Sequence, residues 1–425
     1  MPSERKKESS IGSNVATIVL AGGQGTRLFP LTANRCKPAV AFGGRYRLID
    51  IPISNSLNSK IRQIFVISQY FASDLHQHIT STYQLDRFRE GGIELLTPQE
   101  TPEGKNWYKG TADAVRQNLD FLLKTPAEYF LILSGDQLYN MDLVRMIQFA
   151  KKEDADLVIA ALPVKEAEAR RMGLLKIDSA SRITDFYEKP QEAAQLKYFQ
   201  LPEKADPPHY LGSMGIYVFK RSAIASLAEE TGDDFGKHLI PTLIKKSKSS
   251  AFVYDGYWED IGTVASYYQA NLALTTQRNC LDTYNENNPI FSQPYNIPGA
   301  MIRGTKVKNS IISQGAIVEA EEITHSVVGI RSQIGKGTII RDSIIIGNRF
   351  YHPPEHLRAQ LPTHLTIGQN CLIEKAIVDE HTSIGNHVQL INKQNIQKMD
   401  GDGIYIREGI IIVMPGTSLP DGFIL

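Results

Sequence analysis

An apolar run, TIVL at Thr17–Leu20, leads directly into the glycine-rich stretch AGGQGTRL at Ala21–Leu28. Such a run followed by a tight loop is typical of a buried strand whose carboxyl end opens onto a binding site. Further apolar runs occur at 64–67, 130–133 and 157–160, and amphipathic stretches such as 112–123 and 143–152 lie between several of them. Buried strands joined by helical crossovers predict an α/β fold with a doubly wound, mostly parallel sheet. The residues after each run are therefore the first candidates for a site.

The last third of the chain has a different repeat. Apolar residues recur there about every six positions, at Ile311, Ile317, Ile323, Val328, Ile334, Ile340, Ile346, Leu372, Val378, Ile384 and Leu390. This period predicts a parallel β-helix of hexapeptide repeats, with one apolar residue for each face of each coil, and we expect the helix to be left-handed. Residues 348–363 contain three prolines and break the period, so we expect a loop there.

Composition excludes several classes of protein. The 46 basic and 46 acidic residues cancel, so no basic excess indicates a nucleic-acid partner. No apolar run approaches the length that crosses a bilayer, so we expect no membrane partner. Three scattered cysteines make no disulfide framework, and the polar N-terminus lacks the core of a secretory signal. We expect a cytoplasmic protein.

The three glycines Gly22, Gly23 and Gly25 let backbone amides approach a polyphosphate closely. Two familiar nucleotide motifs do not fit. A dinucleotide fingerprint that starts at Gly23 would need glycine where Leu28 stands, and the stretch from Gly329 has the wrong spacing for a P-loop.

The longer string LAGGQGTRLFPLTANRCKP, residues 20–38, resembles the signature of the sugar-1-phosphate nucleotidyltransferases. More segments narrow the resemblance to the glucose-1-phosphate adenylyltransferases, also called ADP-glucose pyrophosphorylases. These are GRYRLIDIPISNSLNSKI (44–61), NWYKGTADAV (106–115), SGDQLYNMD (134–142), FYEKP (186–190), GSMGIYVF (212–219) and WEDIGT (258–263). The resemblance covers almost the whole chain.

The resemblance implies a Rossmann-like nucleotidyltransferase domain with a β-helix behind it, usually in a homotetramer. We expect a flexible tail at 1–14, the catalytic domain at 15–275, a linker at 276–300, and a β-helix for assembly and regulation at 301–425. The implied reaction joins ATP and α-D-glucose 1-phosphate to give ADP-glucose, the donor for glycogen or starch synthesis, and pyrophosphate. The sugar phosphate oxygen attacks the α-phosphorus in line, so catalysis depends on alignment and charge neutralisation.

Two carboxylates and two cations are the expected catalytic groups. Asp136 follows the apolar run at 130–133, where a carboxylate is well placed for Mg²⁺, and Asp260 is implied as the second ligand. Asp136 could instead be the N-cap of a following turn, and Asp260 could cap a helix that starts near Thr263. Arg27 can clamp ATP phosphates with its planar guanidinium, and Lys37 is implied to bind phosphate; both could instead be solvated surface residues.

The resemblance also implies the substrate contacts. Lys189 would bind the phosphate of glucose 1-phosphate, and Glu188 and Ser213 the glucose hydroxyls. Gly173 and Tyr108 would contact the nucleotide sugar. Gln99 is a candidate reader of adenine, because an amide can pair with the adenine edge; it could equally be a surface residue.

Other functions stay open. The glycine loop does not separate ADP-glucose synthesis from UDP-, dTDP- or GDP-sugar synthesis. A non-catalytic regulatory subunit of the same family would be expected to lose catalytic side chains. This chain has all five of those expected, which are Arg27, Lys37, Asp136, Lys189 and Asp260. A hexapeptide acyltransferase would use histidines of the repeat region, which are His325, His364, His381 and His387.

The resemblance further implies control by phosphorylated metabolites. Many bacterial relatives carry a lysine near Asn34, which puts a fructose-1,6-bisphosphate site in doubt here. Arg35 and Arg407 remain candidate ligands for an anionic effector. The sequence identifies neither the activator nor the inhibitor.

Overall fold

A computed structural model describes residues 12–85, 91–101, 104–105, 107–202 and 209–425. The expected N-terminal tail up to position 11 and Asn106 of the NWYKGTADAV segment lie outside these residues. Gly12–Asn14, the end of that tail, forms a short 3₁₀ turn. In the described part of the chain, no helix combines the length and apolar character needed to cross a membrane.

The chain divides into two compact units that do not follow the sequence order. The first unit contains the described residues up to Gly23, together with Ile51–Trp258 and Tyr284–Ile290. The second contains Gln24–Asp50 and Glu259–Thr283 as well as Phe291–Leu425. The glycine loop is therefore shared, because Gly22 and Gly23 belong to the first unit and Gly25 to the second.

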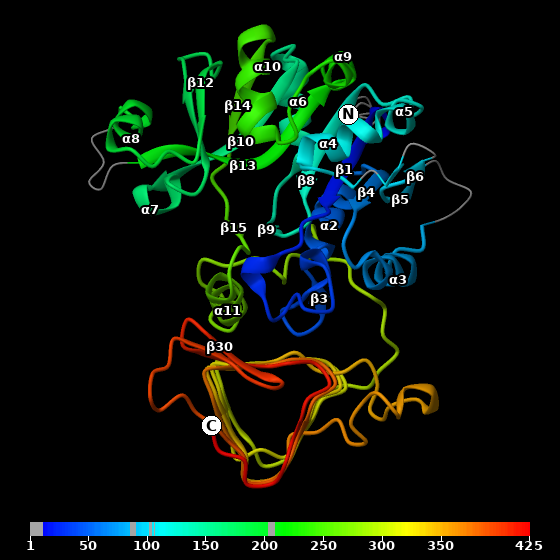
Figure 1. The fold of residues 1–425 in the computed structure, drawn as a ribbon, viewed down its shortest axis with the longest axis vertical. Helices are drawn as coiled ribbons and strands as arrows, with labels where there is room; N and C mark the ends of the chain where they lie inside the picture. Colours follow the sequence, from blue (N-terminus) through cyan, green and yellow to red (C-terminus); the bar gives the residue numbers. More distant parts are fainter. Residues whose placement is uncertain (1–11, 86–90, 102–103, 106, 203–208) are drawn as a thin grey trace. The chain divides into compact units, whose positions relative to one another are not determined.

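A nine-stranded mixed sheet forms the centre of the first unit (Figure 1). Its main order is β12-β11-β13-β8-β1-β4-β5, and β10 joins β13 to β14. The neighbours β8, β1, β4 and β5 are parallel, whereas β13 runs antiparallel to both β8 and β10. The strands are β1 Val15–Ala21, β4 Gln63–Ser68, β5 Gly92–Leu96, β8 Tyr129–Ser134, β10 Leu157–Lys165, β11 Gly173–Ile177, β12 Ile183–Glu188, β13 His209–Lys220 and β14 Ser249–Val253.

Both faces of this sheet are covered, which explains the continuous apolar runs. Along β8, Phe130 and Ile132 enter one core and Leu131 and Leu133 the other, as the two-residue period of a strand requires. The expected helix at 143–152 is observed as α6, capped by the Asp142 side chain, which accepts from the Val144 amide at 3.0 Å. The helices are α2 Asp50–Asn58, α3 Ala72–Thr82, α4 Thr111–Gln117, α5 Leu119–Leu122, α6 Leu143–Lys152, α7 Glu166–Ala169, α8 Ala193–Phe199, α9 Arg221–Ala225 and α10 Ile240–Lys246.

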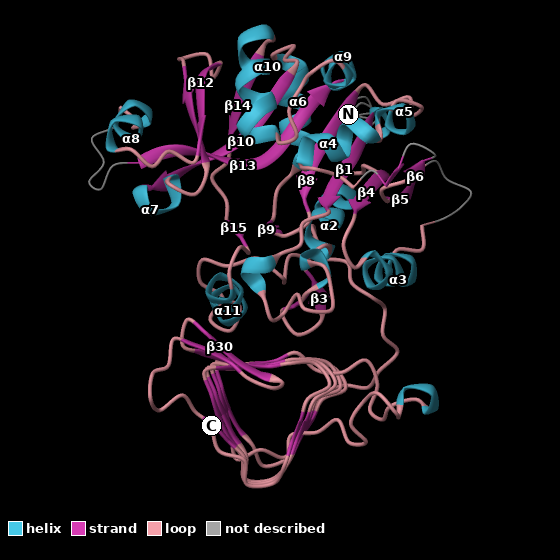
Figure 2. Cartoon of the chain, viewed as in Figure 1, coloured by secondary structure: helices cyan, strands magenta, loops and turns pink. Residues whose placement is uncertain are grey.

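The end of the chain forms the expected parallel β-helix, whose coils appear as a triangle in Figure 1 and whose strands form its sides in Figure 2. One side contains β16 Met301–Ile302, β19 Ile317–Val318, β22 Gln333–Ile334, β27 Ser383–Ile384 and β32 Ser418–Leu419. The second contains β17 Lys306–Lys308, β20 Glu322–Thr324, β23 Ile339–Arg341, β25 Leu372–Glu374 and β28 Gln389–Leu390. The third contains β18 Ile311–Ile312, β21 Val327–Val328, β24 Ile344–Ile345, β26 Ala376–Val378 and β31 Ile410–Val413, and continues into the antiparallel strands β30 Ile404–Arg407 and β29 Lys398–Asp400.

The phase of the repeat differs from the prediction at four positions. The side chains packed in the coil core are Ile312, Val318, Ile345 and Ile373, one residue away from the predicted Ile311, Ile317, Ile346 and Leu372. The register gives the reason. Ile317 pairs with Gln333, so this coil closes in slightly fewer than three six-residue steps. The loop at 348–363 is confirmed, because β24 pairs directly with β26 across it.

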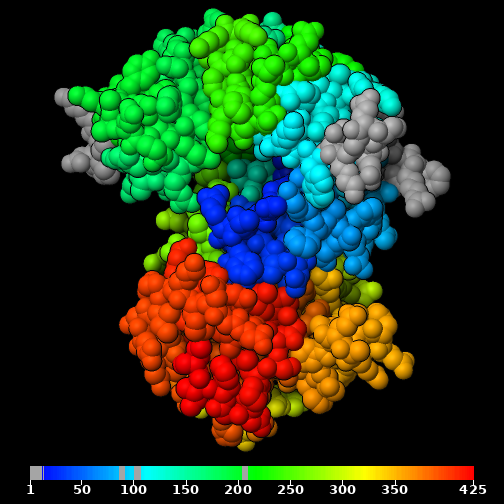
Figure 3. Space-filling view, viewed as in Figure 1, coloured from blue at the N-terminus to red at the C-terminus, as the bar shows by residue number. Residues whose placement is uncertain are grey.

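The segment Gln24–Asp50 packs against the β-helix within the second unit. The Ile330 amide donates to the Gly44 carbonyl at 3.1 Å, and the Phe29 and Tyr405 rings meet edge to face at 5.3 Å. In Figure 3 the dark-blue atoms of this segment border the red atoms of the last coils. Helix α11, Val264–Ala273, holds the same segment through the Tyr267 hydroxyl, which donates to the Ala41 carbonyl at 2.7 Å.

Candidate functional site

Gly22, Gly23 and Asp136 follow two neighbouring parallel strands of the first unit. Leu20 of β1 is in register with Ser134 of β8, so both strands end at the same edge of the sheet. The Gly135 amide donates to the Leu20 carbonyl at 3.0 Å, which ties the two loops together. The structure thus brings the start of the glycine loop and Asp136 to the edge where α/β proteins bind ligands.

Asp136 lies in the tight turn between β8 and the short strand β9, Gln137–Tyr139. It is half-buried, and the Ser134 hydroxyl donates a hydrogen bond to its carboxylate. The alternative role of helix cap is wrong, because no helix begins at this turn and α6 is capped by Asp142. Its carboxylate therefore projects from the end of a buried strand.

Gly25 needs to be glycine for two reasons. Its φ of 65° is left-handed, and an added Cβ would lie 2.9 Å from the Lys37 Cβ. The Thr32 hydroxyl donates to the Gly25 carbonyl at 3.0 Å and closes the loop. An added Cβ at Gly23 would meet no described atom within 4 Å, so packing does not explain glycine there and a ligand could approach the backbone.

The cations of the second unit differ in exposure. Arg27 is exposed in the 3₁₀ turn η2, Thr26–Leu28, whose last residue is buried. Lys37 is buried at the start of η3, Lys37–Ala39, so its interpretation as a solvated lysine is wrong. Its Nζ lies 3.7 Å from Asp260 Oδ1. A buried ammonium beside a partly exposed carboxylate can contribute its charge to a bound phosphate.

Asp260 ends β15, Trp258–Asp260, and does not cap α11. The cap is Thr263, whose hydroxyl accepts from the Ser266 amide at 3.1 Å. Asp260 and Asp136 belong to different units. The part of the chain that the structure describes holds no cluster of three or more His, Cys, Asp or Glu side chains suited to a metal.

A second group of predicted residues meets on β11, β12 and β13. Gly173 is in register with Glu188, and Leu174 with Gly212, so Ser213 lies at the same end of the ladder. The Ser213 hydroxyl accepts from the Gly215 amide at 3.3 Å. The pKa of the nearby Tyr217 is raised chiefly by burial and further by Glu188, and Ser213 partly opposes this. Glu188 and Ser213, expected at the glucose hydroxyls, and Gly173, expected at the nucleotide sugar, therefore lie together within one unit.

The Glu188 carboxylate is seated between two glycines. An added Cβ would lie 2.7 Å from Glu188 Oε2 at Gly173 and 2.5 Å from it at Gly236, in the π-helical turn η5, Phe235–Leu239. Burial raises the pKa of Glu188, and the neighbouring Lys189 ammonium, with Nζ 3.4 Å from Oε1, partly opposes this. A desolvated carboxylate is suited to accept hydrogen bonds from sugar hydroxyls.

Lys189 has a φ of 52°, which is uncommon for a residue with a side chain. Its amide donates to the Met172 carbonyl at 3.1 Å, and its side chain is more than half exposed. Backbone strain of this kind tends to occur at functional sites, where the surrounding structure holds the residue in place. A backbone constrained in this way would suit a Lys189 ammonium that binds a phosphate.

Tyr108 lies beside the end of β4. Its amide donates to Gln69 Oε1 at 2.7 Å, and its hydroxyl accepts from Asn118 Nδ2 at 3.0 Å. Burial raises its pKa. The neighbouring Trp107 is half exposed and stacks on Tyr70 with ring centroids 5.3 Å apart. Gln99 is exposed in the segment after β5.

Sequence reasoning missed Gln69, Ser134 and Gly236. Gln69 directly follows β4, and Ser134 ends β8, so the rule that sites follow strands could have found both. Nothing local marks Gly236, because its closeness to Glu188 arises only in the fold.

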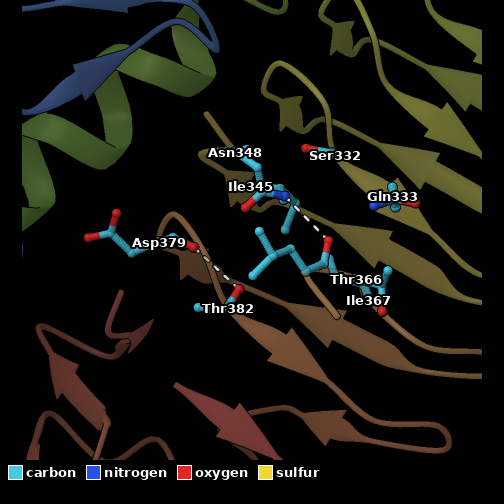
Figure 4. Close-up of a pocket in the computed structure, with 10 residues that line it drawn as sticks. Ser332, Gln333, Ile345, Asn348, Thr366, Ile367, Asp379 and Thr382 are labelled. Carbon is cyan, nitrogen blue, oxygen red and sulfur yellow. Dashed lines mark hydrogen bonds between the residues drawn. The ribbon is translucent and has the colours of Figure 1, made fainter. Parts of the chain in front are cut away.

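The two candidate effector ligands have internal partners. Arg35 is buried and pairs with Asp379 at 3.1 Å and Glu380 at 3.3 Å. Arg407 pairs with Asp400 at 2.5 Å and packs on the Phe29 and Tyr405 rings. A small pocket also lies in a wall of the β-helix near Asn348 and Thr382 (Figure 4). It contains none of the predicted site residues.

Comparison with known families agrees with this geometry. Residues 16–277 match the family described as nucleotidyl transferase, and residues 296–424 match the GLGC left-handed parallel beta-helix domain. The first match covers more than half of the chain, including both groups of site residues on the sheet. The chain therefore belongs to the nucleotidyl transferase family and carries a left-handed β-helix of the GLGC type.

Proposed function

We propose that this nucleotidyl transferase moves the adenylyl group of ATP to α-D-glucose 1-phosphate and releases ADP-glucose and pyrophosphate. One observation carries the proposal most directly. The desolvated carboxylate of Glu188, between Gly173 and Gly236, lies beside the ammonium of Lys189. This is an arrangement that suits a sugar with an attached phosphate. The preference for adenine and glucose rests on the sequence segments that resemble the glucose-1-phosphate adenylyltransferases.

In this proposal the protein acts by alignment. The planar guanidinium of Arg27 and the buried ammonium of Lys37 bind ATP phosphates. Lys189 binds the phosphate of the sugar, whose oxygen attacks the α-phosphorus of ATP. The bond from that phosphorus to the bridging oxygen breaks, and pyrophosphate leaves. The protein supplies no nucleophile, so its contribution is orientation and neutralisation of charge.

The carboxylates of Asp136 and Asp260 would hold Mg²⁺. Magnesium prefers one or two carboxylates together with phosphate and water oxygens, and both side chains offer oxygen donors at strand ends. The Ser134 hydroxyl would fix the orientation of the Asp136 carboxylate. When bound, the ion neutralises phosphate charge that would otherwise repel the incoming sugar phosphate.

The setting of the enzyme is also a proposal. We propose a cytoplasmic homotetramer that makes the glucosyl donor for α-glucan synthesis and responds to phosphorylated metabolites. The first coil of the β-helix supports assembly, because Met301, Ile302 and Val307 are exposed on its edge strands. A β-helix end of this kind needs a cap or a partner.

Turnover with glucose 1-phosphate and Mg²⁺ should be compared for ATP, UTP, dTTP and GTP. We expect kcat/KM for ATP to exceed the others by about two orders of magnitude or more, because a site that hydrogen-bonds one base leaves polar groups unpaired with another. A preference for another nucleotide would replace the substrate assignment. Absence of turnover with all four would favour a regulatory subunit.

A further inference from the structure

Arg35 joins the segment that carries Lys37 to a corner of the β-helix. Its Nη1 lies 3.1 Å from Asp379 Oδ1, and its Nη2 lies 3.3 Å from Glu380 Oε1. All three side chains are largely buried, and the partners are separated by 344 residues in the sequence. In a buried setting, loss of one partner leaves an uncompensated charge, so this contact is hard to break.

The corner that holds Arg35 is itself braced. Arg349 binds Glu380 through two nitrogens, at 3.1 and 3.3 Å. The Glu380 amide donates to Asp379 Oδ1 at 2.7 Å, and the Thr382 hydroxyl donates to the Asp379 carbonyl at 3.3 Å. Figure 4 shows the Asp379 carboxylate pointing away from the small pocket near Thr382. The backbone of this turn therefore fixes the direction of the carboxylate.

Lys37 lies only two residues beyond Arg35 and has little freedom of its own. Lys37 is buried, and the glycine loop packs closely on it. A Cβ added at Gly25 would lie 2.9 Å from the Lys37 Cβ. A shift of Arg35 would consequently move both Lys37 and the glycine loop that packs on it.

We propose that Asp379 and Glu380 are positioning residues for nucleotidyl transfer, which hold Lys37 and Gly25 in place through Arg35. The β-helix then helps to build the phosphate-binding part of the site. Arg35, a candidate effector ligand in the sequence, acts in this proposal as an internal link. The inference rests on the proposed role of Lys37 in binding ATP phosphates.

The test is Glu380→Gln in the full-length protein, with Glu319→Gln as the matched control. Glu319 also pairs with an arginine, Arg303 at 2.8 Å, but on the exposed surface of the coils. We expect Glu380→Gln to raise KM for ATP about tenfold, because small displacements of binding groups are costly, and to leave KM for glucose 1-phosphate within about twofold. A purely structural defect would lower the amount of active enzyme and leave both KM values unchanged. The control should change neither.

A double mutant tests whether Glu380 acts through Arg35. Arg35→Lys keeps the charge but loses the planar fork. Adding Glu380→Gln to it should raise KM for ATP by less than about twofold further, whereas independent effects would multiply. Asp379→Asn provides a second variant should Glu380→Gln not fold.

Hydrogen exchange separates this inference from the proposed function. Residues 24–50 should exchange faster in Glu380→Gln and at the original rate in Glu319→Gln, whatever the substrate is. Unchanged exchange with unchanged KM for ATP would overturn the positioning role. Faster exchange in a protein that turns over no nucleotide would leave the link intact and reject the proposed reaction instead.

Discussion

Replacing Gly236 by alanine should displace the Glu188 carboxylate from its position between Gly173 and Gly236. The new Cβ would lie 2.5 Å from Oε2. An ordinary contact between these atoms is roughly 3.5 Å, so the carboxylate must move by about 1 Å. A misplacement of that size costs about a hundredfold in rate, which corresponds to roughly 3 kcal/mol of transition-state stabilisation. We expect this loss in kcat/KM for the sugar phosphate, with KM for ATP nearly unchanged.

The assay is steady-state kinetics with each substrate varied in turn, together with a thermal melt. Gly92→Ala is the control, since an added Cβ there meets no described atom within 4 Å. Adding Glu188→Asp to Gly236→Ala shortens the acid and removes the clash, so part of the lost kcat/KM should return. Near-normal kinetics in a well-folded Gly236→Ala protein would refute the role of Gly236 in placing the Glu188 carboxylate. Equal losses of kcat/KM toward both substrates would indicate a general defect.

Three further predictions concern single groups. Asp136→Asn should lower kcat at least about a hundredfold with little change in melting temperature, because it removes charge without creating a cavity; near-normal turnover would exclude Asp136 from the site. Lys189→Ala should raise KM for glucose 1-phosphate more than it lowers kcat, since the phosphate is bound in ground and transition states alike; a change confined to KM for ATP would contradict this. The third concerns pH. Although burial opposes it, Arg35 and Arg349 lower the pKa of Glu380 to about 2, so its contribution to stability is full above the ordinary range for glutamate and is lost as pH falls toward that value. The free energy of unfolding should therefore depend less on acid pH in Glu380→Gln. An identical dependence in both proteins would count against a stabilising interaction of Glu380 with Arg35 and Arg349.

Local patterns were sufficient for the architecture. Each predicted strand core lies inside an observed strand, and the helix expected at 143–152 has those bounds. The amphipathic stretch at 112–123 is interrupted at Asn118, which separates α4 from α5. These features follow from residue spacing and turn chemistry, which act over a few positions and need no knowledge of distant partners.

The exact phase of the coils was not available from the period alone. Four of the predicted apolar positions differ by one residue from those packed in the coil core, because coils that close in fewer than eighteen residues shift the pattern at their corners. Left-handed residues such as His325 and Asp342 occupy these corners and are compatible with many spacings. Only the parallel pairing of successive coils fixes which side chain points inward.

The family, the two kinds of fold and the candidate chemical residues could be predicted from the amino-acid sequence, because a glycine loop, a strand end and a repeat are local features. The contacts of those residues depend on the folded chain. In the fold, the buried Lys37 lies beside Asp260, and Gly236 lies against the Glu188 carboxylate. Arg35 binds Asp379, which is 344 residues away in the sequence. Such contacts depend on how distant segments are brought together, and burial then strengthens each charge by removing water. No periodicity or spacing in the chain records that juxtaposition.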